Sequence, residues 1–274
     1  MHAPEPICAA HATIPRPATA ANAARPERPS PVTDSVDRLF SDPLRAPAPF
    51  RFDQRVVEVF PDMLRRSVPG YETVIAMTGL LAARFAVEGS NLYDLGCSLG
   101  AGTLAMHRRL EGRDCAIVAV DSSPAMIEGC RRRLGALAPA PRLDLRESDL
   151  RDVRIDNASV VVLNYTLQFV PVEERPRLLE RIGAGLRPEG LLLLSEKVVF
   201  PDPALNRLNI DLHHDFKRAH GYSELEIAAK RDALDKVLIP ETLAAHRERL
   251  RGAGFKSCEV WFQCFNFASL IALK

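Results

Sequence analysis

The sequence has no long hydrophobic run and no excess of one charge. Its longest apolar runs, such as Leu191–Leu194 and Val160–Leu163, are far shorter than the roughly 20 residues that span a bilayer. We therefore predict no membrane span. Lysine and arginine number 36 against 35 acidic residues, and a net charge of +1 provides no general field that attracts a polyphosphate. Direct binding to nucleic acid is not expected.

The cysteines and histidines do not form a metal-binding pattern. Six cysteines are scattered without a C-x-x-C pair or a Cys/His spacing suited to zinc: Cys8, Cys97, Cys115, Cys130, Cys258 and Cys264. We interpret them as reduced thiols of a cytoplasmic protein rather than as a disulfide framework. The adjacent His213 and His214 would point roughly 100° apart on a helix, so they cannot chelate one ion together. No metal cofactor is predicted.

Residues 1–33 differ in composition from the rest of the chain. Ten of the 21 prolines lie in residues 1–50, among Ala, Arg and Ser, without hydrophobic periodicity. This composition predicts a disordered extension whose deletion leaves stability and activity nearly unchanged. Met1–Cys8 lacks the basic and apolar regions of a secretory signal, and a transit peptide is the weaker alternative to a dispensable tail. Residues 34–274 are long enough for one catalytic domain.

From Glu88 onward, short apolar runs alternate with helical segments, which is typical of βαβ units. The predicted strands are Leu92–Leu95, Ala116–Asp121, Leu143–Glu147, Val160–Tyr165 and Leu191–Glu196, and the predicted helices are Thr103–Leu110, Ala125–Leu137 and Glu173–Leu186. Two last strands, Lys256–Cys264 and Asn266–Leu273, predict an antiparallel hairpin. The fold class is therefore α/β, with a doubly wound, mostly parallel sheet. This arrangement is typical of the Rossmann-like fold of S-adenosylmethionine (AdoMet) methyltransferases. Helical segments at about 55–87 and 204–250 do not belong to this alternation of strands and helices, and we predict that they form a lid over the ligand.

Candidate ligand-binding residues follow four successive strands. Asp94–Thr103 is a glycine-rich strand-to-helix turn, of the kind that brings the backbone close to a nucleotide. Asp121 can accept both ribose hydroxyls, Asp149 and Leu150 can recognise adenine, and Asn164 ends the fourth strand. Each could separately be a plain turn or a solvated loop residue, but their shared position favours one site. Asp94 suits the sulfonium of AdoMet better than a pyrophosphate.

Motifs outside the glycine-rich turn make a more specific comparison. They are E-V-F-P-D-M (Glu58–Met63), R-S-V-P-G-Y (Arg66–Tyr71), Y-D-L-G-C-S-L-G (Tyr93–Gly100), S-P-A-M-I-E (Ser123–Glu128), L-S-E-K (Leu194–Lys197), H-H-D-F-K-R-A (His213–Ala219), G-Y-S-E-L-E-I (Gly221–Ile227) and W-F-Q-C-F-N-F (Trp261–Phe267). From about Asp37 to Lys274, the chain resembles the carboxy-S-adenosyl-L-methionine synthase family. Ser122 and Ser148 depart from the family's usual Asn and Gly, and the proline-rich extension is unusual.

The resemblance implies which residues bind the ligand. The family's AdoMet contacts correspond to Tyr71, Gly96, Cys97, Ser98, Asp121, Ser122, Asp149, Leu150 and Asn164. Its carboxylate-binding arginine corresponds to Arg231, which we predict to be catalytic and to lie in a dry pocket; the alternative is a solvated helix charge. Arg218 and Lys217 are secondary candidates, and Tyr222 is expected to line the pocket.

The resemblance also implies a reaction. AdoMet and prephenate would yield carboxy-AdoMet and phenylpyruvate, and the product would serve a tRNA carboxymethyltransferase that forms 5-oxyacetyluridine at the wobble position. The family resemblance further implies a homodimer, and carboxy-AdoMet is expected to copurify. A conventional methyltransferase acting on a small molecule or RNA, or a non-catalytic AdoMet-binding scaffold, are the alternatives.

Overall fold

The computed structural model describes residues 35–42, 50–235 and 237–274. The described residues belong to one compact unit, Asp34–Lys274. The predicted extension at residues 1–33 lies outside the described residues and stays a prediction. Among the described residues, no helix is long and apolar enough to cross a membrane.

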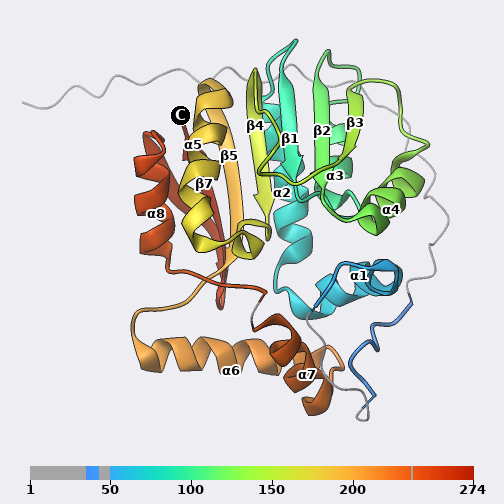
Figure 1. Ribbon diagram of the computed structural model, residues 1–274, viewed down its shortest axis with the longest axis vertical. Helices are drawn as coiled ribbons and strands as arrows, with labels where there is room; N and C mark the ends of the chain where they lie inside the picture. Colours follow the sequence, from blue (N-terminus) through green and yellow to red (C-terminus); the bar gives the residue numbers. More distant parts are fainter. Residues whose placement is uncertain (1–34, 43–49, 236) are drawn as a thin grey trace, which may run out of the picture. The chain divides into compact units, whose positions relative to one another are not determined.

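One sheet of seven strands organises the described chain, in the order β3-β2-β1-β4-β5-β7-β6 (Figure 1). The strands are β1 Asn91–Leu95, β2 Ala116–Asp121, β3 Arg142–Glu147, β4 Ala158–Asn164, β5 Leu186–Lys197, β6 Ser257–Cys264 and β7 Phe267–Leu273. The first five strands pair in parallel, and β7 runs antiparallel to both β5 and β6. The predicted α/β fold with its final hairpin is confirmed.

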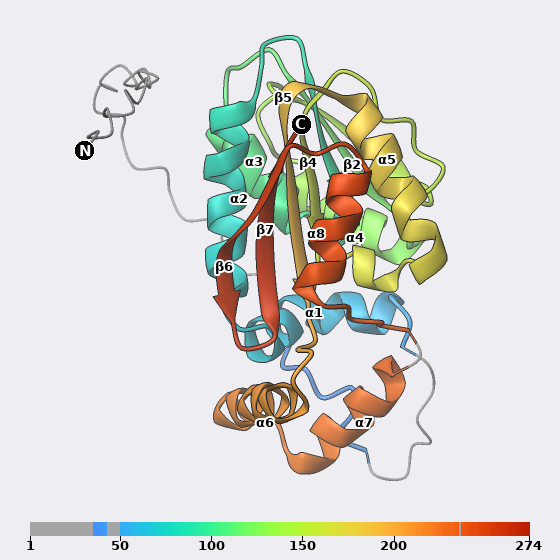
Figure 2. The same ribbon diagram turned by 90° about the vertical axis from the view of Figure 1, so that its left-hand side faces the viewer.

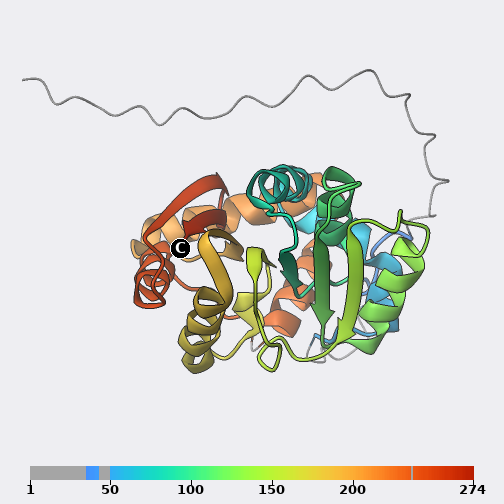
Figure 3. The same cartoon turned by 90° about the horizontal axis from the view of Figure 1, so that it is seen from above.

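Helices cover both faces of this sheet (Figures 2 and 3). They are α1 Gln54–Ser67, α2 Tyr71–Phe85, α3 Ala101–Arg109, α4 Pro124–Leu134, α5 Arg175–Gly185, α6 Pro203–Ala219, α7 Glu224–Leu234 and α8 Leu243–Gly252, with short 3₁₀ helices η1 Leu167–Phe169 and η2 Val172–Glu174. Side chains alternate along the strands, so Val161 and Leu163 pack with α5 and α8, whereas Val160 and Val162 pack with α2 and α3.

Polar caps fix where several helices begin. The side chains of Asp53, Ser123, Asp202, Ser223 and Thr242 each accept backbone N–H groups from the first turn of α1, α4, α6, α7 and α8, respectively. These N–H groups have no partner within their own helix, so each cap stabilises its helix by about 1 kcal/mol. The caps therefore set the borders of the segments that follow the strands.

The lid is smaller than predicted. Helices α1, α6 and α7 lie beyond the carboxyl ends of the parallel strands (Figure 1), but α2 and α8 do not belong to this layer. Ala82 of α2 and Leu250 of α8 are fully buried in the cores on the two faces of the sheet. The prediction that all of 55–87 and 204–250 forms a lid is wrong for these helices, because their apolar faces pack against strands.

Hydrogen bonds between distant segments hold the lid together. Arg66 of α1 donates to the carbonyl of His220 at 2.7 Å, and His213 Nε2 of α6 bonds the carbonyl of Ser67 at 2.8 Å. The Tyr222 hydroxyl, just before α7, donates to the buried carboxylate of Asp37. The lid helices and residues 35–42 are thus joined to one another as well as to the sheet.

Candidate active site

A cavity of about 970 Å³ lies between the strand ends and the lid. Nine of the ten predicted binding residues line it: Tyr71, Gly96, Cys97, Ser98, Asp121, Ser122, Asp149, Leu150 and Asn164. Arg231 is the exception. These nine residues lie up to 93 positions apart in the sequence, from Tyr71 to Asn164. The expectation that polar residues at successive strand ends face one space is therefore fulfilled.

The glycine-rich turn connects β1 to α3 and forms one wall of the cavity. Gly96 has a φ of +82°, and a Cβ there would lie 2.4 Å from the side chain of Thr166. No other residue type fits this close approach without displacing Thr166. Ser98 also adopts a left-handed conformation, with a φ of 49°, where a glycine would carry less strain.

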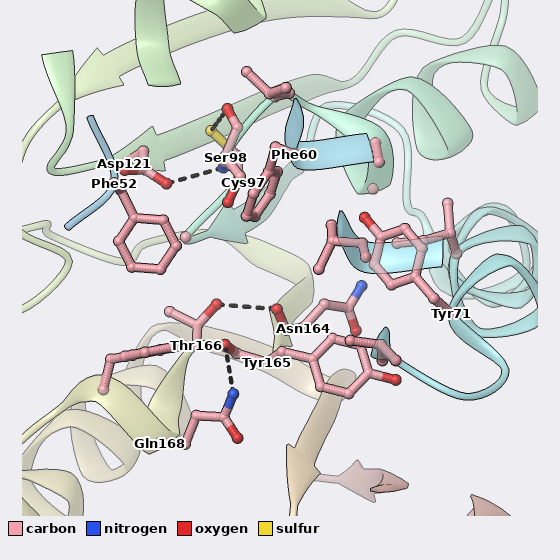
Figure 4. A pocket seen from close by; sticks show the side chains of 18 of the residues that line it. Phe52, Phe60, Tyr71, Cys97, Ser98, Asp121, Asn164, Tyr165, Thr166 and Gln168 are labelled. Carbon is pink, nitrogen blue, oxygen red and sulfur yellow. Dashed lines mark hydrogen bonds between the residues drawn. The ribbon is translucent and has the colours of Figure 1, made fainter. Parts of the chain in front are cut away.

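Asp121 fastens this turn to the end of β2 (Figure 4). Its carboxylate accepts the backbone N–H of Ser98 at 2.9 Å and the backbone N–H of Ser123 at 2.9 Å. Burial raises the pKa of Asp121, although these N–H groups oppose the shift. A carboxylate has further acceptor positions, so Asp121 can bind two hydroxyl groups while it keeps the turn in place.

Asp94 places a second carboxylate at the base of the turn. It is only 3% exposed and accepts a hydrogen bond from the Thr103 hydroxyl at 2.7 Å. Burial raises its pKa to about 6. No arginine or lysine is paired with Asp94 among the described contacts. A buried carboxylate in this setting favours a cationic ligand such as a sulfonium or an ammonium.

Asn164 is held in place from two sides. Its side-chain amide donates to Thr78 Oγ1 of α2 at 3.3 Å, and its Oδ1 accepts the Ser195 hydroxyl of β5 at 2.9 Å. The next residue, Tyr165, has a φ of 60° and therefore leaves the strand, one residue before its predicted end. This sharp turn directs the Tyr165 ring into the cavity (Figure 4).

Aromatic side chains form a continuous wall from α2 to α6. The ring of Tyr71 lies 6.2 Å from that of Tyr165, which lies 6.1 Å from Phe267. Phe267 in turn contacts the ring of His213 at 4.8 Å. Burial raises the pKa of both tyrosines, so their hydroxyls remain neutral.

Asp149 is engaged by Arg151 in the described structure. The Arg151 guanidinium bonds both carboxylate oxygens at 2.6 to 3.0 Å and also contacts Glu174 at 2.7 Å. Arg151 lowers the pKa of Asp149. The predicted contact between Asp149 and an adenine amino group stays a prediction, and it requires sharing this carboxylate with Arg151.

Arg231 does not face the cavity. Its side chain is 62% exposed, and its guanidinium bonds Asp232 at 3.1 and 3.2 Å. The predicted dry environment of Arg231 is therefore wrong for the described chain, since α7 turns this position outward. Arg218 is also outside the cavity, in ion pairs with Asp215 and Glu224.

The other secondary candidates have different outcomes. Tyr222 is buried against Asp37 and does not line the cavity, because its hydroxyl is used within the lid. Lys217 does line it, together with Lys197 at the end of β5 and Lys230 of α7. Sequence reasoning missed Lys197, although it follows the fifth strand as directly as Asp121 follows the second.

Four phenylalanines were also missed. The ring of Phe52 packs edge-on against Phe50 at 5.1 Å, Phe60 at 6.1 Å and Phe169 at 5.4 Å, and all four line the cavity. Figure 4 shows Phe52 and Phe60 beside Ser98 and Asp121. They come from the segment before α1, from α1 and from η1. Their sequence separation left no local signal, and they provide the apolar surface that excludes water.

The described residues contain no group of three or more His, Cys, Asp or Glu side chains placed to hold a metal ion. Within the same residues, Cys97, Cys115, Cys130, Cys258 and Cys264 are free thiols. Cys97 lies in the glycine-rich turn, and its interaction with the Cys130 thiol, together with burial, raises its pKa. The cavity lining offers carboxylates, amines, guanidinium groups, amides and aromatic rings.

Comparisons with known proteins agree with this geometry. A family model described as a methyltransferase domain matches residues 92–190. A carboxy-S-adenosyl-L-methionine synthase from Geobacter sp. is 57% identical over 244 residues, which cover 89% of this chain and 100% of that protein. One of the same name from Vibrio campbellii is 56% identical over 238 residues, covering 87% and 97%.

Solved structures share the fold at lower identity. An O-methyltransferase family protein from Burkholderia thailandensis has a TM-score of 0.58 and 20% identity, covering 84% of this chain and 65% of that one. Human N-acetylserotonin methyltransferase, solved in complex with SAM, has a TM-score of 0.53 and 17% identity, covering 81% and 55%. At this identity, the likeness establishes the fold.

Proposed function

Because the chain belongs to the carboxy-S-adenosyl-L-methionine synthase family, we propose that it converts AdoMet and prephenate into carboxy-AdoMet and phenylpyruvate. The observation that carries this proposal within the molecule is that nine residues implied to bind AdoMet line one cavity. The same cavity has cationic side chains at Lys197 and Lys217, which suit a second, anionic substrate.

The reaction balances without an added reagent. Prephenate loses carbon dioxide and hydroxide as its ring becomes aromatic, which leaves phenylpyruvate. The hydroxide takes a proton from the AdoMet methyl group and becomes water, and the resulting carbanion forms a bond to the carbon of carbon dioxide. The departing hydroxide serves as the base, so the protein's task is to hold both substrates close together and to exclude bulk water.

The residues of the cavity supply these conditions. Asp121 and Asn164 are pre-oriented by hydrogen bonds, so they can bind the nucleoside without reorganisation. Asp94 attracts the positive charge of AdoMet. The Phe50, Phe52, Phe60 and Phe169 cluster covers the turn and keeps water from competing for the carbanion.

Arg231 is proposed to bind the carboxylate of carboxy-AdoMet, as the family resemblance implies. To do so, its guanidinium must exchange Asp232 for the ligand, because Asp232 holds it in the described structure. It lies within electrostatic range of Lys217, whose pKa it helps to lower. This proposal therefore requires a movement of α7 or of the Arg231 side chain.

Mass spectrometry tests the proposed function. The purified chain is incubated with AdoMet and prephenate, and the nucleoside product is identified. We expect a species heavier than AdoMet by one carbon dioxide, with phenylpyruvate in equal amount. S-adenosylhomocysteine with a methylated acceptor would instead indicate a conventional methyltransferase, and AdoMet binding without any product would indicate a non-catalytic AdoMet-binding scaffold.

Three further proposals concern the protein's setting. We propose that a tRNA carboxymethyltransferase consumes the product in forming 5-oxyacetyluridine, that the chain forms a homodimer and that it acts in the cytoplasm. The near-neutral net charge of +1 supports transfer of a small molecule rather than direct contact with tRNA. Sedimentation velocity of the full chain tests the dimer, and a concentration-independent monomer would contradict it.

A further inference from the structure

Lys217 is a buried amine that has no counter-ion among the described residues. Its side chain is 7% exposed, lines the cavity, and makes no hydrogen bond or ion pair with any of the described residues. Lys197 likewise lines the cavity and has no side-chain partner in the described part of the chain. An ammonium group removed from water without a partner is costly, so a bound anion would compensate both.

The charges around Lys217 are of the same sign. Burial lowers the pKa of Lys217 to about 7, and the charges of Lys230 and Arg231 on α7 and of Lys197 on β5 act in the same direction. On α6, burial and the charges of Lys217 and Lys197 lower the pKa of His213, which therefore stays neutral. Like charges repel, so this arrangement is unfavourable when the cavity holds no anion.

Lys230 differs from the other two amines. It lies 3.7 Å from the carboxylate of Asp37 and donates to the Ser67 hydroxyl at 3.1 Å. The carboxylate of Asp37 thus partly balances the charge of Lys230. The amines of Lys197 and Lys217 line the cavity without such a carboxylate among the described residues. Of the three lysines that line the cavity, Lys197 and Lys217 are therefore the two without a partner among the described residues.

The lysines are connected to the predicted AdoMet site. The aromatic wall begins at Tyr71 and ends at His213, which is one helical turn before Lys217 on α6. Asp94, Asp121 and Asp149 line the same cavity and belong to the β1, β2 and β3 ends of the sheet. The cavity therefore has acidic residues at those strand ends and amines on β5 and α6.

We propose that Lys197 and Lys217 form the carboxylate-binding subsite for the anionic co-substrate, a small dicarboxylate. This assignment rests on the proposed function, in which prephenate carries two carboxylates. Two separate ammonium groups can hold two separate carboxylates, and their location on β5 and α6 joins the sheet to the lid around the ligand. Two point charges on flexible stems also tolerate the change in shape as the ring becomes aromatic.

Lys217→Met and Lys197→Met test the subsite, with Lys217→Arg as the charge-conserving variant. Arg207→Gln is the matched control, because Arg207 is an exposed cation of the same helix outside the cavity. Because the amine that is removed is buried and unpaired among the described residues, we expect each methionine variant to melt at or above the temperature of wild type. Measuring the melting temperature therefore verifies that each variant is folded. We expect KM for prephenate to rise about tenfold or more in either methionine variant, while the Kd for AdoMet changes less than about twofold. Lys217→Arg should recover part of the loss.

A binding measurement separates this proposal from the proposed function. Prephenate is titrated by calorimetry into the complex of each variant with S-adenosylhomocysteine, which has no methyl group to react. Binding by wild type and loss in the methionine variants supports the subsite even if no carboxy-AdoMet forms. An unchanged prephenate Kd in both variants overturns it, and so does an equal loss of AdoMet affinity, which would assign the lysines to the methionine carboxylate of AdoMet.

Discussion

Asp94 illustrates how one buried residue can favour ligand binding at the expense of stability. Its folded pKa of about 6 lies above its ordinary value near 3.8, so its contribution to stability is fully present below pH 4 and is lost as the pH rises through 6. The difference corresponds to roughly 3 kcal/mol at pH 8. Asp94→Asn should therefore stabilise the unliganded protein at pH 8 but weaken AdoMet binding.

Thermal melts at pH 5 and pH 8 check this expectation, with AdoMet titrations at pH 8. The stabilisation by asparagine should shrink at pH 5, where wild-type Asp94 is mostly protonated. A destabilisation of equal size at both pH values would show that the charge of Asp94 does not matter.

Lys217 predicts the pH dependence of co-substrate use. Among the described residues, the groups that face it are Lys197 of β5, Lys230 and Arg231 of α7, and its neighbours His213 and His214, and none of these is acidic. An anion binds the protonated amine, so kcat/KM for prephenate at saturating AdoMet should fall about tenfold per pH unit above about 7. In Lys217→Arg this fall should move to higher pH; the same profile in both proteins would assign it to another group.

Arg231 is expected to have a small effect, because 62% of its side chain is exposed. Arg231→Leu should weaken carboxy-AdoMet by about 1 kcal/mol or less, which is about fivefold, and leave AdoMet affinity unchanged. Calorimetry with both ligands measures the difference. A loss of several kcal/mol would mean that Arg231 becomes buried in the liganded or assembled protein, and no loss would exclude it from ligand binding.

At the scale of elements, one hydroxyl connects the segment before α1 to the segment before α7. The carboxylate of Asp37 is buried and accepts the Tyr222 hydroxyl. Tyr222→Phe removes this donor and should lower the free energy of unfolding by about 1–3 kcal/mol. Because the lid covers the cavity, kcat/KM should fall as well.

Tyr93→Phe is the matched control. Its hydroxyl donates to Asp156 at 3.0 Å, and Tyr93 does not line the cavity. We expect it to lower the melting temperature without lowering kcat/KM. If the two variants lose activity in the same proportion to stability, the Tyr222 contact has no specific role in the lid.

The sequence predicted the sheet better than the lid. β1, β2, β4 and the second half of β5 are mainly apolar runs, and β3 alternates apolar with polar residues. These patterns depend only on neighbouring residues. The partner of a helix is a tertiary property: the apolar face of α2 packs on the sheet, whereas that of α1 packs against Leu99 and Met126. Periodicity identifies a buried face but not the surface that covers it.

The residues of the candidate site were likewise predictable only where local sequence determines their position. Asp121, Asp149 and Asn164 were predictable because carboxyl ends of parallel strands share one edge of the sheet. Lys217 could be named from its motif, but only the packing of α6 distinguishes it from its exposed neighbour Arg218. A helix that rotates by one residue exchanges a cavity position for a surface position, and no local pattern determines that rotation.

At the scale of the whole molecule, the cavity is lined by both the sheet and the lid, so a ligand should connect them. We expect AdoMet to slow amide hydrogen exchange in α1 and α7 as well as in the turn after β1. Helix α8 is the internal reference, because it does not line the cavity. Hydrogen-exchange mass spectrometry measures this; protection confined to the strand ends would contradict a ligand that touches the lid.

The opposite charges of the cavity lining also bear on how long each molecule stays bound. AdoMet is attracted mainly by Asp94 and Asp121. Carboxy-AdoMet carries an additional carboxylate, which Arg231 is proposed to bind and which the charges of Lys197 and Lys217 also attract once phenylpyruvate has left. The product therefore has an extra electrostatic anchor, and its residence time should exceed that of the substrate from which it was made. Stopped-flow displacement would measure both dissociation rates. If release is slow, the enzyme also stores its product: bound carboxy-AdoMet is kept away from bulk water until a second enzyme takes it up.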